Sequence, residues 1–278
     1  MSSPPRVRVA YLGPPGTFSE EAVGRCDLVA GAERRDHRTI ADVFEAVVRG
    51  DAEFGLLPIE NSLEGSITAT LDMLVHRPGL RIRREVLLPV TQNLLARPGA
   101  SLRDVKRVLS IPIAAAQCQG FLKARLPGVP VEPALSTADA ARLAAERDDS
   151  AAIASRAAAD RYGLAILAEG IQDGDANATR FVLVAREDEK PTGRDRTSIA
   201  FTLDRDRPGG LYEVLGEFAT RQINLSKIES RPSRQALGHY VFYVDFEGHR
   251  SDPLGAAALA GVLQRVHALH LLGSYPRG

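Results

Sequence analysis

The feature that most constrains the fold is the alternation of short apolar runs with helical patterns over residues 7–186. Residues 7–12 form one strand-like run. From Thr39 a stripe with spacing i, i+3, i+4, i+7, i+8 continues until Gly50, which is typical of an amphipathic helix. The stripe consists of Ile40, Val43, Phe44, Val47 and Val48. Strands that alternate with helices predict βαβ units and a mostly parallel sheet.

The same patterns predict the other elements of this part. Thr17 and Glu20 have the spacing of a capping box, which predicts a helix starting at Thr17. We expect further strands at 55–59, 129–135, 151–154 and 180–185, and further helices over 113–126, after Thr137 and from Ser155. This length of α/β sequence is compatible with one sheet or with two lobes, and residues 89–93 lie where a crossover between lobes would fall.

The composition changes at residues 187–195, which contain no apolar side chain and are interpreted as a linker. Beyond it we expect a strand at 197–203, a helix at 210–220, strands at 225–231 and 240–246, a helix at 253–269 and a last short strand. The order βαββαβ predicts a ferredoxin-like domain. The predicted domains are therefore 6–186, with crossovers near 89–93 and 174–180, and 196–275.

Charge and composition exclude several classes of protein. The 35 basic residues balance 35 acidic ones, so a dominant role in binding nucleic acid or a membrane surface is not expected. The longest uncharged stretch, residues 108–122, has 15 residues, too few for a transmembrane helix. The first residues lack the apolar core of a signal peptide. Cys26 and Cys118 are far apart and favour reduced thiols, so we expect a cytoplasmic protein.

Three segments have an unusual composition. Residues 13–20, Gly-Pro-Pro-Gly-Thr-Phe-Ser-Glu, join the first strand to the first helix, whose free N–H groups suit an anion. Residues 58–66 place Glu60 and Asn61 directly after a buried strand, where α/β sheets bind ligands. Residues 177–181 precede an apolar strand, and Arg180 can bind a carboxylate with two hydrogen bonds. The simpler interpretations are a capped turn, capping serines and a surface ion pair.

Common cofactor and metal signatures are absent. The sequence contains neither a Walker loop nor G-x-G-x-x-G, and no G-x-S-x-G elbow. His267 and His270 are three residues apart but have no nearby cysteine or third ligand candidate, so we interpret them as structural. We therefore expect no metal and no cofactor.

Together the three segments resemble the prephenate dehydratase family. The sequences GPPGTFSEEA, PIENSLEGSITATLDML and NATRFVLVAR occur in the order found in that family, and PGGLYEVLGEFATRQINLSKIESRP resembles an ACT regulatory domain. The resemblance covers residues 6–275. It implies a two-lobed α/β catalytic part like a type 2 periplasmic binding protein, followed by the ferredoxin-like ACT domain. The implied enzyme is a carbon–oxygen lyase that converts prephenate to phenylpyruvate, water and carbon dioxide in phenylalanine biosynthesis.

The resemblance also implies site residues. The catalytic candidates are Thr179, Glu60, Asn61 and Arg180. The candidates for substrate binding are Thr17, Ser19, Ser62, Gln117, Ser136, Thr137 and Phe181. Two departures from the family exist: Ile111 stands where many relatives have histidine, and Leu135 stands where a glutamate is common.

The chemistry assigns roles to some of these groups. When the ring carboxylate leaves as carbon dioxide, its electrons move through the ring and expel the hydroxyl group, so no cofactor is needed as an electron sink. Thr179 is the first candidate for the donor to that hydroxyl, and Glu60 is the alternative if burial raises its pKa. Asn61 and Gln117 are expected to orient groups, Arg180 to hold a carboxylate, and Phe181 to keep the cleft dry.

The ACT resemblance implies feedback inhibition by phenylalanine, bound where two copies of the chain meet. The candidate ligand residues are Gly210, Leu211, Asn224, Leu225, Ser230 and Arg231. A homodimer or homotetramer is therefore expected, although the domain could also serve dimerisation alone. Two other functions stay open at this point: an arogenate dehydratase, and a non-catalytic protein that senses an amino acid.

Overall fold

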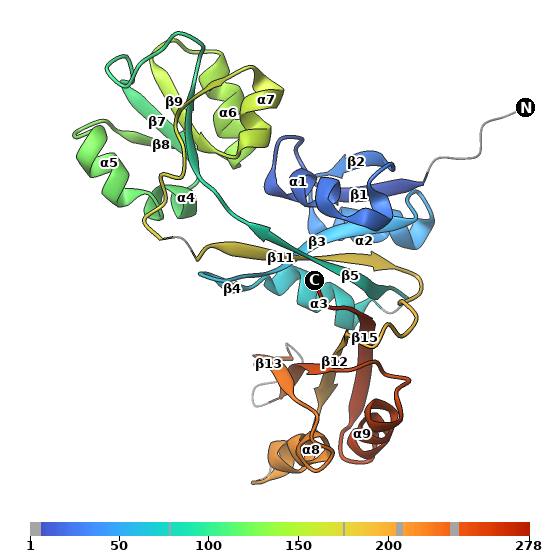
Figure 1. Cartoon of the computed structure of the whole chain (residues 1–278). Helices are drawn as coiled ribbons and strands as arrows, with labels where there is room; N and C mark the ends of the chain where they lie inside the picture. Colours follow the sequence, from blue (N-terminus) through green and yellow to red (C-terminus); the bar gives the residue numbers. More distant parts are fainter. Residues whose placement is uncertain (1–6, 78, 175, 204–207, 234–238) are drawn as a thin grey trace, which may run out of the picture. The chain divides into compact units, whose positions relative to one another are not determined.

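The structure, a computed structural model, describes residues 7–77, 79–174, 176–203, 208–233 and 239–278. The strands form three sheets, and helices are interspersed between them along the chain (Figure 1). By their internal contacts the residues form two compact units. One comprises Met1–Ala46, Leu56–Ile67 and Val86–Phe181, and the other comprises Val47–Gly55, Thr68–Glu85 and Val182–Gly278.

The first sheet has the strand order β2-β1-β3-β11-β5, and β4 pairs with β3. Its strands are β1 (Arg8–Leu12), β2 (Glu33–His37), β3 (Phe54–Asn61), β4 (Gly65–Ser66), β5 (Arg81–Pro89) and β11 (Ala178–Ala185). The predicted βαβ unit is present at the start of the chain, where β1 and β2 are parallel and the connection contains α1 (Phe18–Arg25) and the short 3-10 helix η1 (Asp27–Val29). Val9, Ala10 and Tyr11 in the middle of β1 are 0–2% exposed, as expected for a strand between two others.

The helix predicted after Thr39 is α2 (Ile40–Arg49). The Thr39 hydroxyl accepts a hydrogen bond from the Asp42 N–H at 3.1 Å, and the Thr39 N–H donates to the Asp42 carboxylate at 3.2 Å. These reciprocal bonds satisfy free donors at the start of the helix. Gly50, with φ of +81°, follows the last turn, a conformation that favours glycine. The next helix, α3 (Thr68–His76), follows β4.

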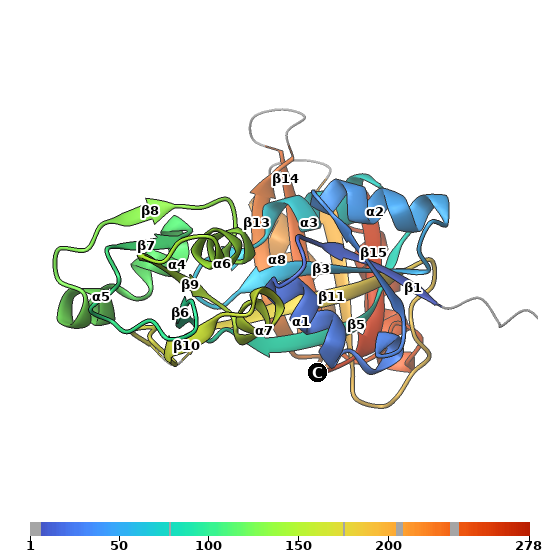
Figure 2. The same ribbon diagram turned by 90° about the horizontal axis from the view of Figure 1, so that it is seen from above.

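The second sheet has the order β10-β6-β9-β7-β8, which can be followed in Figure 2. Its strands are β6 (Asn93–Ala96), β7 (Arg107–Ser110), β8 (Val131–Pro133), β9 (Ser150–Ala154) and β10 (Ala165–Ala168). β7 is parallel to β8 and β9, whereas β6 is antiparallel to β9 and β10. The sheet is thus mixed, because β6 is entered directly from the first sheet and not through a helix.

Helices cover both faces of the second sheet. They are α4 (Pro112–Ala116), α5 (Gln119–Arg125), α6 (Thr137–Ala145) and α7 (Arg156–Tyr162). Leu94 and Ile153 pack with residues of α4 and α5, while Leu95 and Ala152 pack with residues of α6 and α7. Neighbouring residues of one strand thus enter different cores, as the alternation of side chains along a strand requires.

Two predictions in this region are wrong in detail. The single helix expected over 113–126 is two helices, α4 and α5, with Gln117 and Cys118 between them. At this break the Gln117 carbonyl accepts a hydrogen bond from the Asp173 N–H at 2.6 Å, so a tertiary contact replaces a helical one. The strand expected over 129–135 is the shorter β8, and Leu135 beyond it is 95% exposed.

The C-terminal sheet has the antiparallel order β13-β14-β12-β15. Its elements are β12 (Asp195–Thr202), α8 (Gly210–Ala219), β13 (Leu225–Pro232), β14 (Tyr240–Glu247), α9 (Pro253–Leu263) and β15 (Ala268–Pro276). Both helices contribute to one core with Phe201, Val244 and Phe246. The predicted βαββαβ order is confirmed. The helix expected over 253–269 is wrong at its end, because residues from Ala268 pair with β12 instead.

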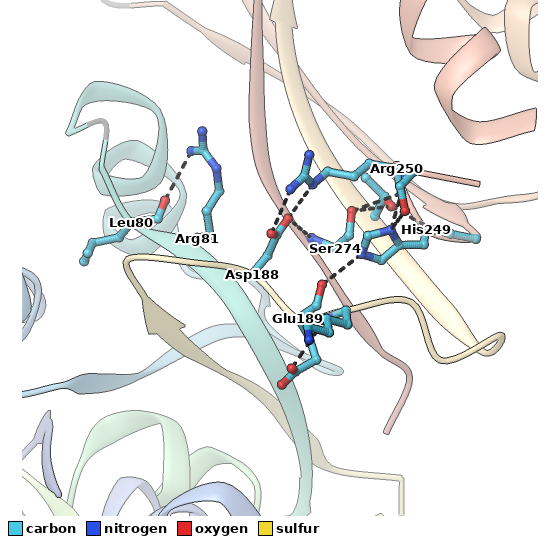
Figure 3. A network of polar contacts seen from close by, with 11 residues as sticks. Leu80, Arg81, Asp188, Glu189, His249, Arg250 and Ser274 are labelled. Atoms are coloured by element: carbon cyan, nitrogen blue, oxygen red, sulfur yellow. Dashed lines mark hydrogen bonds and ion pairs between the residues drawn. The ribbon is translucent and has the colours of Figure 1, made fainter. Parts of the chain in front are cut away.

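The segment interpreted as a linker is held by specific contacts (Figure 3). Asp188 accepts two hydrogen bonds from the Arg250 guanidinium, at 2.8 and 3.1 Å. A ring nitrogen of His249 lies 3.0 Å from the Glu189 carbonyl oxygen, and the Glu189 carboxylate pairs with Arg83 and Arg84 of β5 at 3.2 and 2.8 Å. Asp195, at the end of the expected linker, belongs to β12. The contacts of residues 188–189 therefore fix this segment to other residues of the same compact unit, the one that contains Val182–Gly278.

Candidate active site

The candidate catalytic residues form two cross-strand pairs between β3 and β11. Asn61 Nδ2 donates to Thr179 Oγ1 at 3.0 Å, and Arg180 Nη1 donates to Glu60 Oε2 at 3.3 Å. The pairing of 60 with 180 and of 61 with 179 means that the strands run in opposite directions here. Successive side chains of a strand point to opposite faces, so the Asn61–Thr179 pair and the Glu60–Arg180 pair lie on different faces. We expected all four groups around one cleft, whereas the register divides them between the two faces of the sheet.

Asn61 has a fixed orientation. Its Oδ1 accepts hydrogen bonds from the Leu63 and Glu64 N–H groups at 2.9 and 3.2 Å. Its Nδ2 therefore faces the other strand, where it also donates to Asn177 Oδ1 at 2.9 Å. A threonine hydroxyl has one hydrogen and two lone pairs. Because Thr179 Oγ1 accepts from Asn61, its own hydrogen stays available, and among the described residues no acceptor is assigned to it.

The amide contacts continue toward the second sheet. Asn177 Nδ2 donates to Gln117 Oε1 at 2.9 Å, and Gln92 Nε2 donates to the same oxygen at 3.4 Å. Gln117 Oε1 thus accepts twice, which directs the Gln117 NH₂ group away from both donors. We call Gln92, Gln117, Asn177, Asn61 and Thr179 the amide network.

The amide network lies where the chain crosses between two sheets. Residues 90–92 lead from β5 to β6, and residues 169–177 lead from β10 to β11. The two crossings are hydrogen-bonded side by side: the Val90 N–H donates to the Asn177 carbonyl at 2.8 Å, and the Ile171 N–H donates to the Gln92 carbonyl at 2.9 Å. These two hydrogen bonds therefore hold together the backbone segments that carry Gln92 and Asn177.

Arg180 is 8% exposed, and its guanidinium faces Glu60, whose side chain is 35% exposed. The ion pair neutralises a charge that would be costly to bury alone. Phe181, the next residue, is 2% exposed and belongs to the interior. Its position on β11 places it on the same face as Thr179.

Ser62 continues the pairing of the two strands. Its N–H donates to the Ala178 carbonyl at 2.9 Å, its hydroxyl donates to the Ala176 carbonyl at 2.7 Å, and the same hydroxyl accepts from the Ala178 N–H at 2.9 Å. These bonds occupy the side chain and fix the ends of both strands next to Asn61 and Thr179.

The glycine-rich loop contacts the start of α7. Its Gly16 carbonyl accepts from the Ser155 hydroxyl at 3.1 Å, while the Gly16 N–H donates to the Glu20 carboxylate at 2.7 Å. The expected capping box is wrong in its contacts, because the Thr17 hydroxyl makes no cap and donates to the Leu12 carbonyl at 3.3 Å. Ser19 is buried in the first turn of α1.

The remaining substrate-binding candidates lie at the start of α6. Ser136 caps this helix by accepting from the Asp139 N–H at 2.9 Å, and Thr137 is buried. Within the described part of the chain, no hydrogen bond links either residue to the amide network. Cys118, next to Gln117, is fully buried; burial above all, and then Asp173, raises the pKa of its thiol to about 12. A thiol that stays protonated is a poor nucleophile.

The candidate phenylalanine residues lie at two ends of the C-terminal sheet. Asn224 and Leu225 are at the start of β13, whereas Arg231 pairs through Val241 with Thr202, the end of β12. Gly210 begins α8, which follows β12, so Gly210 and Leu211 lie at the Ser230–Arg231 end. Arg231 lies six positions after Leu225 along the strand, or ~20 Å at about 3.3 Å per residue.

Two members of the amide network, Asn177 and Gln92, were not among the expected site residues. Asn177 belongs to the quoted motif, and Gln92 lies in the stretch noted as a crossover, but neither pattern indicates a contact with Gln117. The described residues contain no group of three or more metal-ligating side chains. No helix among them has the length and apolar character needed to cross a bilayer.

Fold and site define a mixed α/β protein whose polar site spans two sheets and which ends in a ferredoxin-like domain. Residues 9–189 match the model of the prephenate dehydratase family, and residues 197–264 match that of the ACT domain. The chain therefore belongs to the prephenate dehydratase family, as the four motifs predicted.

Relatives agree over nearly the whole chain. A prephenate dehydratase of Mycobacterium tuberculosis is 42% identical over 98% of this chain and 88% of its own length. A crystal structure of prephenate dehydratase from Arthrobacter aurescens in complex with L-Phe has a TM-score of 0.90 and 43% identity, covering 98% of this chain and 90% of that one. The structure of GqqA, described as a quorum quenching acylase, has a TM-score of 0.88 and 32% identity, with 98% of both chains covered.

Proposed function

We propose that this chain converts prephenate to phenylpyruvate, water and carbon dioxide at the amide network, with Thr179 as the donor to the departing hydroxyl group. The observation that carries this proposal is the 3.0 Å hydrogen bond from Asn61 Nδ2 to Thr179 Oγ1. That bond occupies a lone pair of the hydroxyl and leaves its hydrogen for the substrate.

The reaction needs a hydrogen-bond donor for the hydroxyl group on one ring carbon. At the opposite ring carbon the carboxylate must lose its negative charge as it leaves. The bond from the ring to its carboxylate breaks, the electron pair moves through the ring, and the bond to the hydroxyl group breaks. Hydroxide leaves and takes a proton from solvent to become water, while the carboxylate becomes carbon dioxide. A threonine hydroxyl is a weak acid, so we assign to Thr179 a hydrogen bond that stabilises the departing hydroxide.

The other groups have supporting roles in this proposal. Gln117 presents its NH₂ group as a second donor, and Asn61 and Asn177 hold the two donors in place. Ser62, Thr17, Ser19, Ser136 and Thr137 remain candidates for contacts with substrate. We give Glu60 a structural role beside Arg180, because strand alternation places it on the face opposite Thr179. In this proposal Arg180 fixes the register of β3 and β11 through its ion pair with Glu60. The expected role of Arg180 in binding a substrate carboxylate is then the less supported alternative.

The same chemistry with arogenate would yield phenylalanine, so substrate preference decides between two enzymes. Purified protein incubated in parallel with prephenate and with arogenate provides the test. We expect phenylpyruvate, detected by its absorbance in alkali, and a higher kcat/KM for prephenate. Absence of turnover with both substrates would leave a non-catalytic sensor as the better interpretation.

We propose further that phenylalanine inhibits the enzyme by binding to the ACT domain of an oligomer. The candidate residues lie in two groups ~20 Å apart on β13, too far for one amino acid to touch both. β13 is an edge strand. Antiparallel pairing of β13 from two copies would bring the start of the strand in one copy beside the end of the strand in the other. A dimer would contain two such sites, and a tetramer would pair two dimers.

Calorimetric titration with phenylalanine, combined with light scattering, tests this arrangement. We expect binding that weakens in Asn224→Ala and in Ser230→Ala alike, in an oligomer whose mass is unchanged. Coupling of binding must be reciprocal, so phenylalanine and a prephenate analogue should each lower the affinity for the other. An oligomer that binds no phenylalanine would indicate a domain that serves assembly only. A cytoplasmic location, supported by two buried free cysteines, completes the proposal.

A further inference from the structure

Gln92 is a buried polar residue on the crossing from β5 to β6. Its side chain is almost wholly enclosed, since the residue is 3% exposed. Its backbone is held on both sides: the N–H donates to Gln172 Oε1 at 3.0 Å, and the carbonyl accepts from the Ile171 N–H at 2.9 Å. The side-chain amide is therefore not needed to satisfy the backbone at this position.

The side chain itself is only half satisfied. Nε2 donates to Gln117 Oε1 at 3.4 Å, whereas no donor among the described residues reaches the buried Oε1 of Gln92. A buried acceptor without a partner lowers stability, and an apolar side chain of the same shape would avoid this cost. Such a group calls for an explanation other than stability.

The contact with Gln117 supplies that explanation. A single bond from Asn177 would leave the Gln117 amide free to turn about the line joining the two groups. A second donor, carried by a different segment of the chain, restrains its plane, because Gln117 Oε1 then accepts from two fixed groups. Restraint of this plane determines where the Gln117 N–H groups point.

We propose that Gln92 is a positioning residue for the dehydratase reaction, which acts by orienting the Gln117 amide toward the substrate. This inference rests on the proposed function. Gln92 makes no contact with substrate in this scheme, and its effect passes through Gln117 alone. A misdirected Gln117 would weaken a hydrogen bond that must be aligned in the transition state.

Gln92→Met tests the proposal, because methionine keeps the length of the side chain and removes both polar atoms. We expect kcat with prephenate to fall by on the order of 10-fold, while the midpoint of thermal unfolding stays equal or rises. Gln119→Met is the matched control, since Gln119 is exposed on α5 and donates only to the Ala115 carbonyl. It should keep wild-type kcat. A Gln92→Met protein with wild-type kcat, or one whose activity falls only as its folded fraction falls, overturns the proposal.

Gln92→Glu provides a readout that a structural role would not change. A protonated glutamic acid can donate its O–H to Gln117 Oε1, whereas the ionised form offers only acceptors and repels that oxygen. The ratio of variant to wild-type kcat should therefore rise as the pH falls, and the same ratio for Gln92→Met should stay flat. A flat ratio for a folded Gln92→Glu protein contradicts the proposal. Wild-type protein without activity on prephenate would instead refute the proposed function, and this inference with it.

Discussion

Replacement of Thr179 by valine separates chemistry from stability, because valine has nearly the same shape and lacks the hydroxyl group. In the structure the lost group accepts one hydrogen bond, from Asn61 Nδ2, which keeps Asn177 Oδ1 at 2.9 Å and the Ala178 carbonyl at 3.3 Å as acceptors. No donor is left unsatisfied, so we expect a loss of only ~1 kcal/mol in the free energy of unfolding. For a chain of this size that corresponds to about 2–4 °C in Tm.

The expected loss of activity is much larger. A hydrogen-bond donor that stabilises the charge developing on a leaving group contributes ~10²–10³-fold in rate, or about 2.7–4.1 kcal/mol in the activation free energy. A loss of ~1 kcal/mol from a typical stability of ~5–15 kcal/mol leaves almost all the protein folded. Reduced folding therefore cannot account for a rate reduction of that size.

The assay is the formation of phenylpyruvate under saturating prephenate, with Tm measured on the same preparations. Thr179→Ser should keep much of kcat because it retains the hydroxyl. Thr220→Val is the matched control: this hydroxyl donates to the Gly216 carbonyl at the end of α8, in the ACT domain. The assignment of Thr179 is refuted if Thr179→Val has kcat within about threefold of wild type, or if serine restores nothing over valine.

Three further predictions concern single side chains. Asn61→Asp keeps the size of the side chain but replaces the amide donor with a carboxylate, to which the Thr179 hydroxyl should then donate. We expect kcat to fall at least ~10-fold in a folded protein. An unchanged kcat would contradict the role of the amide network. Partial burial alone would raise the pKa of Glu189, but its two arginine partners outweigh this and hold the pKa below its ordinary value of 4.5. The ion pair therefore stabilises the fold at pH values above the ordinary pKa, and this stabilisation is lost as the pH falls through the lowered pKa. On acidification the Tm of Glu189→Gln should therefore fall less than the Tm of wild type. Curves of Tm against pH that run parallel for the two proteins would argue against the pair. Gly16 has φ of +90°, and a Cβ there would lie 3.3 Å from the Tyr162 ring, so Gly16→Ala should cost about 1–2 kcal/mol in urea unfolding; an unchanged midpoint would disprove the strain.

Local patterns predicted those elements in which neighbouring residues decide the structure. Helix α2 is an example, since its start at Thr39, its apolar stripe and its end at Gly50 are all visible in the sequence. The errors occur where distant contacts decide. Ala268 and Leu269, which were expected at the end of a helix, begin β15 instead, because pairing with β12 selects the strand. The break at Gln117 likewise depends on Asp173, far along the chain.

The motifs predicted which segments form the site but not how their side chains are arranged. Glu60 and Asn61 are adjacent in the sequence, and so are Thr179 and Arg180. Only the register of β3 against β11 shows that Asn61 faces Thr179 while Glu60 faces Arg180. Gln92 could not be found from a motif, because its interest lies in burial and in one contact with Gln117.

Because alternate side chains of β11 point to opposite faces of the sheet, the register of β11 against β3 decides whether Thr179 or Arg180 lies beside the amides. If β11 slid by one residue along β3, the hydroxyl would move to the side now occupied by the guanidinium, and the guanidinium would replace it among the amides. Loss or gain of one residue inside β11 would thus bring a guanidinium to the neutral amide face, while loss or gain of two would keep the present assignment of faces. We therefore expect changes of length that keep this enzyme working to lie mainly in the loops.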